Sequence, residues 1–183
     1  MFFLVFVLFT SLWSVRPLHL VPIGAQRNSL RKNQKLTNSQ TYKPKSMITQ
    51  HQFSLSAKRR GCHLVTHEIL ENLPHPLPQT GLLNLFVQHT SCALSINENA
   101  DPDVRTDMSK ILDHLVKENE PYYDHVFEGA DDMPAHAKSS LFGVSITIPI
   151  TNGRLNLGTW QGIYLCEFRD YGGSRRIVAT IYE

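Results

Sequence analysis

The most regular pattern in the chain is a strict alternation of apolar and polar positions near its C-terminal end. Isoleucines occupy every second position over 146–150, and Asn152-Gly153 then supplies the backbone conformations that tight turns require. The alternation resumes after the turn. The pattern predicts a β-hairpin whose strands cover 144–150 and 154–157.

The region from residue 51 onward contains further runs that are typical of strands. These predicted strands cover 51–55, 62–70, 82–89, 93–97, 162–168 and 175–182. One long helix is predicted over 102–119, because Asp101 can cap it, Pro102 suits its first position, and apolar residues then recur every three or four positions. The segment 121–136 has no such period and is predicted to be a long, functional connection without regular structure.

Nothing in the order of these elements suggests strand–helix–strand units or an internal repeat, which disfavours a parallel, doubly wound sheet. The expected fold class is α+β, a mainly antiparallel and sandwich-like arrangement with one long helix near 102–119. The expected organisation is an N-terminal extension over 1–46 and a single folded domain over 47–183.

Charge is distributed unevenly along the chain, although the formal net charge is only +2. Ten of the eighteen lysines and arginines lie in the first sixty residues, and no acidic residue precedes Glu68. Residues 61–183 carry eight basic and sixteen acidic residues, so the domain is near −8. A domain this acidic lacks the electrostatic footprint of a nucleic-acid-binding protein, and we expect no such partner.

The N-terminal extension contains two conflicting targeting cues. Residues 1–13 are almost wholly apolar, like the core of a secretory signal, and are too few to span a bilayer. Residues 27–45 are basic and free of acid, which is typical of a transit peptide or a disordered linker. A start at Met47 is a third interpretation. We expect a cytoplasmic or organellar (mitochondrial or plastid) protein without a membrane span in the mature domain, and the apolar residues 1–13 leave secretion open.

The three cysteines, Cys62, Cys92 and Cys166, are scattered and form no Cys-x-x-Cys pair. This usage disfavours both a disulfide framework and a thiolate zinc site. Buried thiols in a reducing compartment are the favoured interpretation.

Several motifs of mixed residue type match a single family pattern. They are Arg60-Gly61-Cys62-His63-Leu64-Val65-Thr66, Val87-Gln88-His89-Thr90-Ser91, the segments 96–104 and 133–140, Gly158-Thr159-Trp160-Gln161 and the segment 175–180. At these spacings the region from about residue 47 to residue 183 resembles the YjbQ (UPF0047-type) family, also called secondary thiamine-phosphate synthase enzymes. The resemblance implies the antiparallel fold, a homotrimer, and the metal-assisted joining of a pyrimidine-methyl diphosphate to a thiazole phosphate. The word secondary implies that this is a side activity.

Three histidines are the candidate metal ligands: His89 after a buried strand, His125 in the acidic connection, and His136 before Lys138. Imidazoles that converge from separate segments can bind a divalent transition metal, although the spacing alone does not establish convergence. The resemblance implies it, because these positions match the His-Thr, Tyr-x-x-His-like and Ala-His-x-Lys-Ser elements of the family. The implied cofactor is a divalent metal, Zn or Mg. One departure is Asp131-Asp132-Met133-Pro134, where bacterial relatives often carry Asn.

A second set of residues offers hydroxyl and cationic donors of the kind that bind phosphate. The set comprises Thr90, Ser91, Lys138, Ser139, Ser140 and Arg175. The alternative interpretation is that the serines only turn the chain and the arginines solvate a sheet edge. The expected partner is a small phosphorylated metabolite.

Glu98, Asp101 and His136 are the candidate catalytic residues. Asp101 is also explained by helix capping alone. Glu167 lies in an otherwise apolar strand and, if buried, needs a partner such as Arg169 or Arg175.

Three functions remain open at this point: a thiamine-phosphate-synthase-like transferase, a metal-dependent hydrolase of a small phosphorylated substrate with Glu98 or Asp101 as base, and a non-catalytic trimer held together by metal. The two enzymes predict that His136→Ala loses turnover with the fold intact. The non-catalytic trimer predicts that the same change loses assembly and stability.

Overall fold

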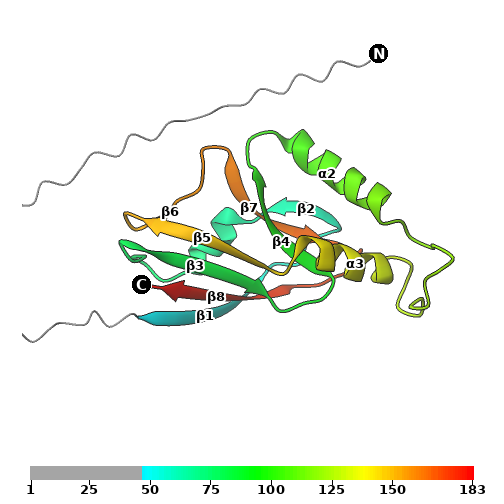
Figure 1. Cartoon of the computed structure of the whole chain (residues 1–183), viewed down its shortest axis with the longest axis horizontal. Helices are drawn as coiled ribbons and strands as arrows, with labels where there is room; N and C mark the ends of the chain where they lie inside the picture. Colours follow the sequence, from blue (N-terminus) through cyan, green and yellow to red (C-terminus); the bar gives the residue numbers. More distant parts are fainter. Residues whose placement is uncertain (1–46) are drawn as a thin grey trace, which may run out of the picture. The chain divides into compact units, whose positions relative to one another are not determined.

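The computed structural model describes residues 47–183, which form a strand-rich α+β domain (Figure 1). The predicted extension over 1–46 and its targeting cues lie outside the described residues. None of the described helices combines the length and the apolar character needed to cross a membrane.

Two sheets form the framework of the domain. One sheet has the strand order β1-β8-β3-β5-β6 and the other has the order β2-β7-β4. The strands are β1 (Ile48–Leu55), β2 (Gly61–Leu64), β3 (Thr80–Val87), β4 (Cys92–Glu98), β5 (Ser145–Thr151), β6 (Arg154–Leu155), β7 (Gln161–Glu167) and β8 (Arg175–Tyr182). Every strand pair within residues 47–183 is antiparallel, which confirms the predicted fold class.

The predicted hairpin is confirmed as β5 and β6. Ile150 pairs with Leu155 across a turn in which Asn152 and Gly153 both have positive φ, at 53° and 71°. This left-handed backbone favours Asn and Gly, so the two turn residues fix the register of the strands they join.

Helix α2 (Pro102–Leu115) begins where it is predicted to begin. The side chain of Asp101 accepts a hydrogen bond from the amide of Asp103 at 2.8 Å, and Pro102 occupies the first turn. The predicted end at Asn119 is wrong, because Val116 has extended backbone, with φ −127° and ψ 95°, and closes the helix after Leu115.

The predicted strand over 62–70 is wrong beyond Leu64, because residues Thr66–Glu71 form the short helix α1. Val65 and Ile69 are both buried, and a spacing of four places them on one side of a helical turn.

The largest error concerns residues 132–142, predicted as the end of a connection followed by strand. They form helix α3 (Asp132–Phe142), a second substantial helix in addition to α2. Pro134 falls within its first turn, where amides have no intrahelical acceptor, so the missing N–H costs nothing there. Gly143, at φ 88°, ends the helix, and its amide bonds to the carbonyl of Ser139.

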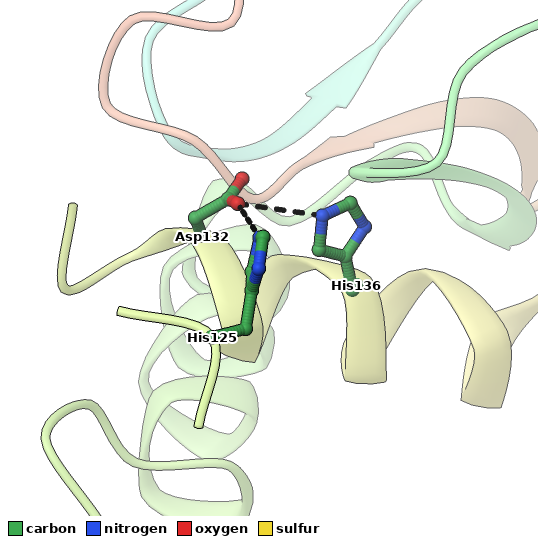
Figure 2. A group of neighbouring side chains, drawn as sticks. All are labelled: His125, Asp132 and His136. Atoms are coloured by element: carbon green, nitrogen blue, oxygen red, sulfur yellow. Dashed lines mark hydrogen bonds and ion pairs between the residues drawn. The ribbon is translucent and has the colours of Figure 1, made fainter. Parts of the chain in front are cut away.

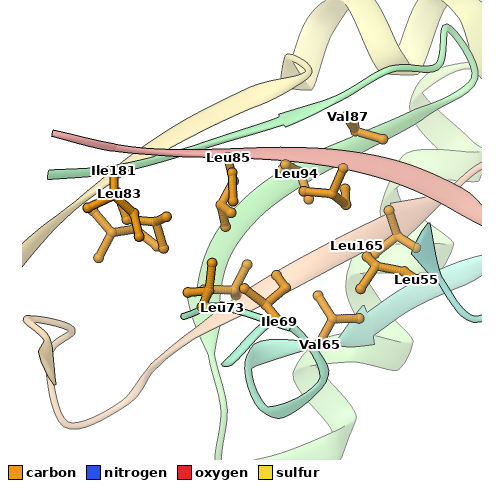
Figure 3. Packing of buried hydrophobic residues seen from close by; sticks show 14 of the residues in the cluster. Leu55, Val65, Ile69, Leu73, Leu83, Leu85, Val87, Leu94, Leu165 and Ile181 are labelled. Carbon is orange, nitrogen blue, oxygen red and sulfur yellow. The ribbon is translucent and has the colours of Figure 1, made fainter. Parts of the chain in front are cut away.

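The hydrophobic core lies in two layers, one on each face of the β2-β7-β4 sheet. The inner layer fills the space between the two sheets and includes Leu83 and Leu85 of β3 and Leu165 of β7 (Figure 3). The outer layer lies between the smaller sheet and the helices and comprises Ala93, Leu112, Ala135, Tyr164, Cys166 and Phe168. Since alternate residues of β7 point into different layers, this strand is buried on both faces from Gly162 onward.

Candidate functional site

Three side chains with metal-ligand chemistry converge at the start of α3 (Figure 2): His125, Asp132 and His136. One ligand atom from each lies within 4.8 Å of the others. His125 Nε2 is 2.6 Å from Asp132 Oδ2, and His136 Nε2 is 3.4 Å from the same oxygen. We call this group the histidine cluster.

Local structure explains the convergence. Asp132 and His136 are four residues apart on α3, so their side chains lie one above the other on one face of the helix. His125 comes from the connection between α2 and α3. Asp132 is 1% exposed, whereas the imidazoles of His125 and His136 are 43% and 34% exposed. The cluster therefore consists of a buried carboxyl group and two partly solvated imidazoles.

Outer contacts hold the cluster in a ligand-competent orientation. His136 Nδ1 lies 3.0 Å from the carbonyl oxygen of Thr90, which only accepts, so the proton sits on Nδ1. The other ring nitrogen, Nε2, faces Asp132. The other oxygen of Asp132 is paired with the guanidinium of Arg169, which also binds Asp131 through Nε at 3.0 Å. Such outer contacts are typical of metal-ligating histidines and carboxylates.

The donor set fits a divalent transition metal. Two imidazoles and one carboxylate match the three-ligand pattern that catalytic zinc sites use, and the two nitrogen donors make the set less suitable for magnesium. The described residues thus provide a plausible zinc-type site, with a position to spare for water or substrate.

His89 does not join the histidine cluster. Its Nε2 accepts a hydrogen bond from the backbone amide of Arg176 at 3.0 Å, and its Nδ1 lies 3.3 Å from the guanidinium of Arg175. Burial lowers the pKa of His89, and the charges of Arg175 and Arg176 lower it further. Because its acceptor nitrogen is already used, this neutral imidazole has no lone pair free for a metal.

His89 and His136 instead lie along one cavity of about 610 Å³, which we call the pocket. It is lined by Phe86, Val87, Gln88, His89, Thr90, His136, Ser139, Ser140, Gly143 and Val144. Its walls come from the end of β3, the turn before β4, and α3. The pocket combines an apolar wall with hydroxyl and imidazole groups, and the histidine cluster adjoins it through His136.

The predicted hydroxyl donors divide into two groups. Thr90, Ser139 and Ser140 line the pocket, and Ser140 Oγ donates to the carbonyl of His136 at 3.0 Å. Ser139 is 3% exposed, and its hydroxyl donates to the carbonyl of Cys92 at 2.7 Å, which ties α3 to β4. Ser91 lies in the same turn as Thr90 and does not line the pocket.

Lys138 points away from the pocket, which corrects its predicted role as a phosphate ligand. Its side chain is 1% exposed, and Nζ lies 2.6 Å from Asp113 of α2. The reason is helical geometry: Lys138 is two positions from His136, so it lies on the opposite side of α3. Its ammonium group instead forms an ion pair that joins α3 to α2.

Arg175 is likewise unavailable to a phosphate. Its guanidinium binds Glu167 in two-pronged fashion, Nε to Oε2 at 2.6 Å and Nη2 to Oε1 at 2.5 Å, and both side chains are almost fully buried. The expectation that Glu167 needs an arginine partner is confirmed, and the partner is Arg175. The pair is a structural ion pair of the inner core layer.

Glu98 and Asp101 lie far from the histidine cluster within one chain. The Cys92 end of β4 is joined to α3, and Glu98 is at the other end, about 20 Å along the strand. Glu98 there borders a separate cavity with Trp160 and Gln161. Asp101 caps α2, so neither carboxylate is in place to act beside His136 of its own chain.

Comparison with known proteins identifies the family of this chain. A family model described as UPF0047 protein YjbQ-like matches residues 51–183. The chain belongs to the YjbQ family.

Named YjbQ relatives are similar over almost their whole length. The UPF0047 protein YjbQ of Escherichia coli O157:H7 is 53% identical over 136 residues, which is 74% of this chain and 98% of the relative. A UPF0047 protein of Synechocystis is 43% identical over 134 residues, 72% of this chain and 91% of the relative. These names state a family and no reaction.

Solved structures agree on the fold. A YjbQ/UPF0047 family protein of Clostridium acetobutylicum is 37% identical with a TM-score of 0.62, covering 72% of this chain and 98% of that one. A protein of unknown function from Sulfolobus solfataricus is only 20% identical, yet it has a TM-score of 0.67 over 75% of this chain and 99% of its own. At that identity the likeness concerns the fold alone.

The sequence reasoning missed Asp132 and Arg169 as members of the site. A usable signal was present in the spacing, because an acid four residues before a histidine places both on one helix face. The signal was lost when residues 121–136 were predicted to be irregular.

Proposed function

We propose that this YjbQ-family protein is a metal-dependent transferase acting on a small phosphorylated substrate, with a thiamine-phosphate-synthase-like reaction as the specific activity. The observation that carries the proposal is the histidine cluster, in which two imidazoles and a buried carboxylate converge beside the pocket. A divalent cation bound there supplies positive charge for a diphosphate leaving group.

The lysine and arginine predicted to bind phosphate are not available in the pocket, which supports a role for a metal. Lys138 and Arg175, the predicted phosphate ligands, are both engaged by buried or partly buried carboxylates. The pocket is lined by hydroxyls, imidazoles and apolar groups, and none of its lining residues is a lysine or an arginine. A diphosphate in the pocket would thus depend on the metal, with Thr90 and Ser140 as hydrogen-bond donors.

The same lining favours transfer over hydrolysis. In the synthase-like reaction the thiazole nitrogen attacks with its own lone pair, a carbon–oxygen bond breaks, and pyrophosphate leaves with that bonding pair. The attacking nitrogen has no proton to lose, so no general base is required. A hydrolase must remove a proton from water, and the carboxylates proposed for that role, Glu98 and Asp101, are placed elsewhere in the chain.

A homotrimer remains part of the proposal. Large apolar side chains surround His125 in the connection, and they are strongly exposed: Tyr122 by 72%, Val126 by 58% and Phe127 by 96%. Exposed apolar groups beside a site are typical of surfaces that contact another chain. A metal that only holds subunits together is the competing function.

The test follows thiamine phosphate formation by the full-length protein, loaded with zinc, from the two precursors. His136→Ala is compared with His114→Ala, which removes an exposed histidine from α2. We expect wild-type and His114→Ala proteins to turn over, and His136→Ala to lose bound zinc and turnover while light scattering still reports its native assembly. Zinc bound at His136 without turnover in the wild type would overturn the synthase-like activity. Loss of the assembly in His136→Ala would instead support the non-catalytic trimer.

A further inference from the structure

A second reactive centre lies on the far side of the β2-β7-β4 sheet from the inner core. Cys62 of β2 and Cys166 of β7 are direct cross-strand partners, and their sulfur atoms are 3.8 Å apart. Both are free thiols. The spacing of the two residues in sequence, 104 positions, gave no hint of this contact.

The hydrogen-bond pattern of the two strands places the cysteines at a position where side chains come closest. The amide of Val65 donates to the carbonyl of Ile163, and hydrogen-bonded and non-hydrogen-bonded pairs alternate along an antiparallel ladder. Counting back from that pair makes Cys62 and Cys166 a non-hydrogen-bonded pair. The amide of Cys62 agrees, since it donates to the hydroxyl of Ser109 at 3.2 Å and not to β7.

This position is compatible with a covalent bond between the two sulfurs. Directly opposite residues of a non-hydrogen-bonded pair have Cα atoms about 4.5 Å apart, within the range that disulfides span. A rotation of the side chains is enough to close the remaining gap between the sulfurs. The backbone need not move.

Access to the pair is provided by a cavity of about 180 Å³ beneath α2. It is lined by Arg60, Gly61, Cys62, Ser109, Leu112, Asp113, Glu167 and Phe168. Cys62 is half-buried at its wall, whereas Cys166 is 4% exposed. A small oxidant therefore reaches Cys62 first.

Hydrogen bonding to Cys62, above all by Cys166, favours its thiolate. The contact with Cys166 lowers the pKa of Cys62 to about 7, and the Ser109 hydroxyl and the charge of Lys138 also lower it, against burial and Asp113. Contact with Cys62 and burial raise the pKa of Cys166, which keeps its proton. Cys92 lies in the inner layer, and burial raises its pKa to about 12. Arg60 and Glu167, which also border the cavity, are engaged in ion pairs of their own.

We propose that Cys62 and Cys166 form a peroxide-reactive dithiol that oxidises reversibly to a cross-strand disulfide, separate from the pocket. The Cys62 thiolate attacks one oxygen of hydrogen peroxide, which cleaves the O–O bond and gives a sulfenic acid at Cys62. The Cys166 sulfur then displaces that oxygen as water while its proton leaves. In total two thiols lose two hydrogens, and one peroxide is reduced to two waters. A cellular dithiol reverses the reaction by thiol–disulfide exchange.

The test treats the full-length protein at about neutral pH with one equivalent of hydrogen peroxide and follows each cysteine by peptide mass spectrometry. We expect an intrachain disulfide joining Cys62 to Cys166 and a free Cys92. Combining thiolate fraction with intrinsic nucleophilicity, loss of the Cys62 thiol should be about a hundredfold faster than loss of the Cys92 thiol. Dithiothreitol should restore both thiols.

Three single variants separate the steps. Cys92→Ser should oxidise like the wild type, and Cys166→Ser should stop at a sulfenic acid on Cys62 that dimedone traps. Cys62→Ser should leave Cys166 reduced. The proposal is overturned if peroxide leaves Cys62 and Cys166 as thiols in the folded wild type, if the linkage formed is between chains, or if Cys166→Ser yields no trapped sulfenic acid. Circular dichroism of each variant verifies that the fold is intact.

Discussion

Two buried carboxylates in this domain have neighbours of the same residue types, but one belongs to a closed structural ion pair and the other to the candidate metal site. Asp132 and Glu167 are 1% and 0% exposed, each is paired with an arginine, and each has a histidine nearby. At Glu167, Arg175 and the amide of Arg169 engage both oxygens, and His89 is neutral with its acceptor nitrogen used. At Asp132, one oxygen is paired with Arg169, and the other faces the imidazoles of His125 and His136.

The comparison shows that residue type does not distinguish a structural centre from a reactive one. The distinction lies in which donors and acceptors are already matched. Around Glu167 both carboxylate oxygens accept hydrogen bonds from Arg175 or from the amide of Arg169, and neither faces an imidazole, so the centre is closed. Around Asp132 one carboxylate oxygen faces the Nε2 atoms of two imidazoles, and these three ligand atoms lie close enough together to share one metal ion.

Removing Arg175 should give the largest effect, and this effect should be on the free energy of unfolding and not on zinc binding. Arg175→Ala leaves the Glu167 carboxylate buried without its partner, and such a change costs about 3–5 kcal/mol of unfolding free energy. Urea denaturation measures it, with the exposed neighbour Arg176→Ala as control. A double change to Arg175→Met and Glu167→Leu should recover much of the loss, and a single-variant cost as small as that of Arg176→Ala would contradict the closed-centre interpretation.

Asp132→Asn should weaken zinc binding at least about 100-fold. Mutating a residue that only contacts a metal ligand typically weakens metal binding about 10- to 100-fold, and replacing a ligand itself should weaken it more. Competition with a chromophoric chelator measures the affinity. Asp124→Asn, an exposed amide substitution in the same connection, is the matched control. If both variants bind zinc equally well, Asp132 is not a ligand and the two centres do not differ in the way described.

Gly172→Ala should disturb the centre at Glu167 without affecting the histidine cluster at Asp132. A methyl group at Gly172 would overlap with the guanidinium of Arg175 and the carboxylate of Glu167. Overpacking of this kind costs about 1–3 kcal/mol. We expect lower urea resistance with unchanged zinc affinity, and Ser174→Ala as a neutral control. Loss of zinc affinity in Gly172→Ala would show that the centres are coupled.

The effect of removing the charge of Asp113, a carboxylate that is 48% exposed, should depend on pH. Burial opposes its ionisation, but hydrogen bonds from Lys138 and Arg60 outweigh burial and hold the pKa of Asp113 below its ordinary value of 3.8. A lowered folded pKa stabilises the protein above the ordinary value, and this contribution is lost as the pH falls through the folded value. Thermal midpoints from about pH 7 to about pH 3 should therefore show Asp113→Asn below wild type at neutral pH, with the gap narrowing below about pH 4. A gap that is independent of pH would contradict this assignment.

The sequence predicted the elements whose causes are local. The β5–β6 hairpin follows from its alternation and from Asn152-Gly153, and the start of α2 follows from Asp101 and Pro102. Helix α3 has no such signal, because its buried residues include Asp132, Lys138 and Ser139 rather than an apolar stripe. Its stability comes from partners far away in sequence, among them the carbonyl of Cys92 and the carboxylate of Asp113.

The errors at Asp132 and Lys138 follow from that one missed helix. His125 and His136 were singled out through the family resemblance, and the structure brings them together. Asp132 was noted only as a departure from the family pattern, since its place beside His136 needs a helical spacing. Lys138 was taken for a phosphate ligand for the same reason, because an irregular chain gives no basis for placing neighbouring residues on opposite sides.

Helix α3 presents a different set of partners on each side, and this has a consequence for how its sequence can change. One side carries the imidazole of His136, another the buried ammonium of Lys138, and a third the hydroxyl that binds β4. Inserting or deleting one residue rotates all that follows by about 100° relative to what precedes it. A single such event between Asp132 and His136 would turn all three side chains away from the position that Asp132 fixes at the start of the helix, so the spacing within α3 is constrained as strictly as its residue types.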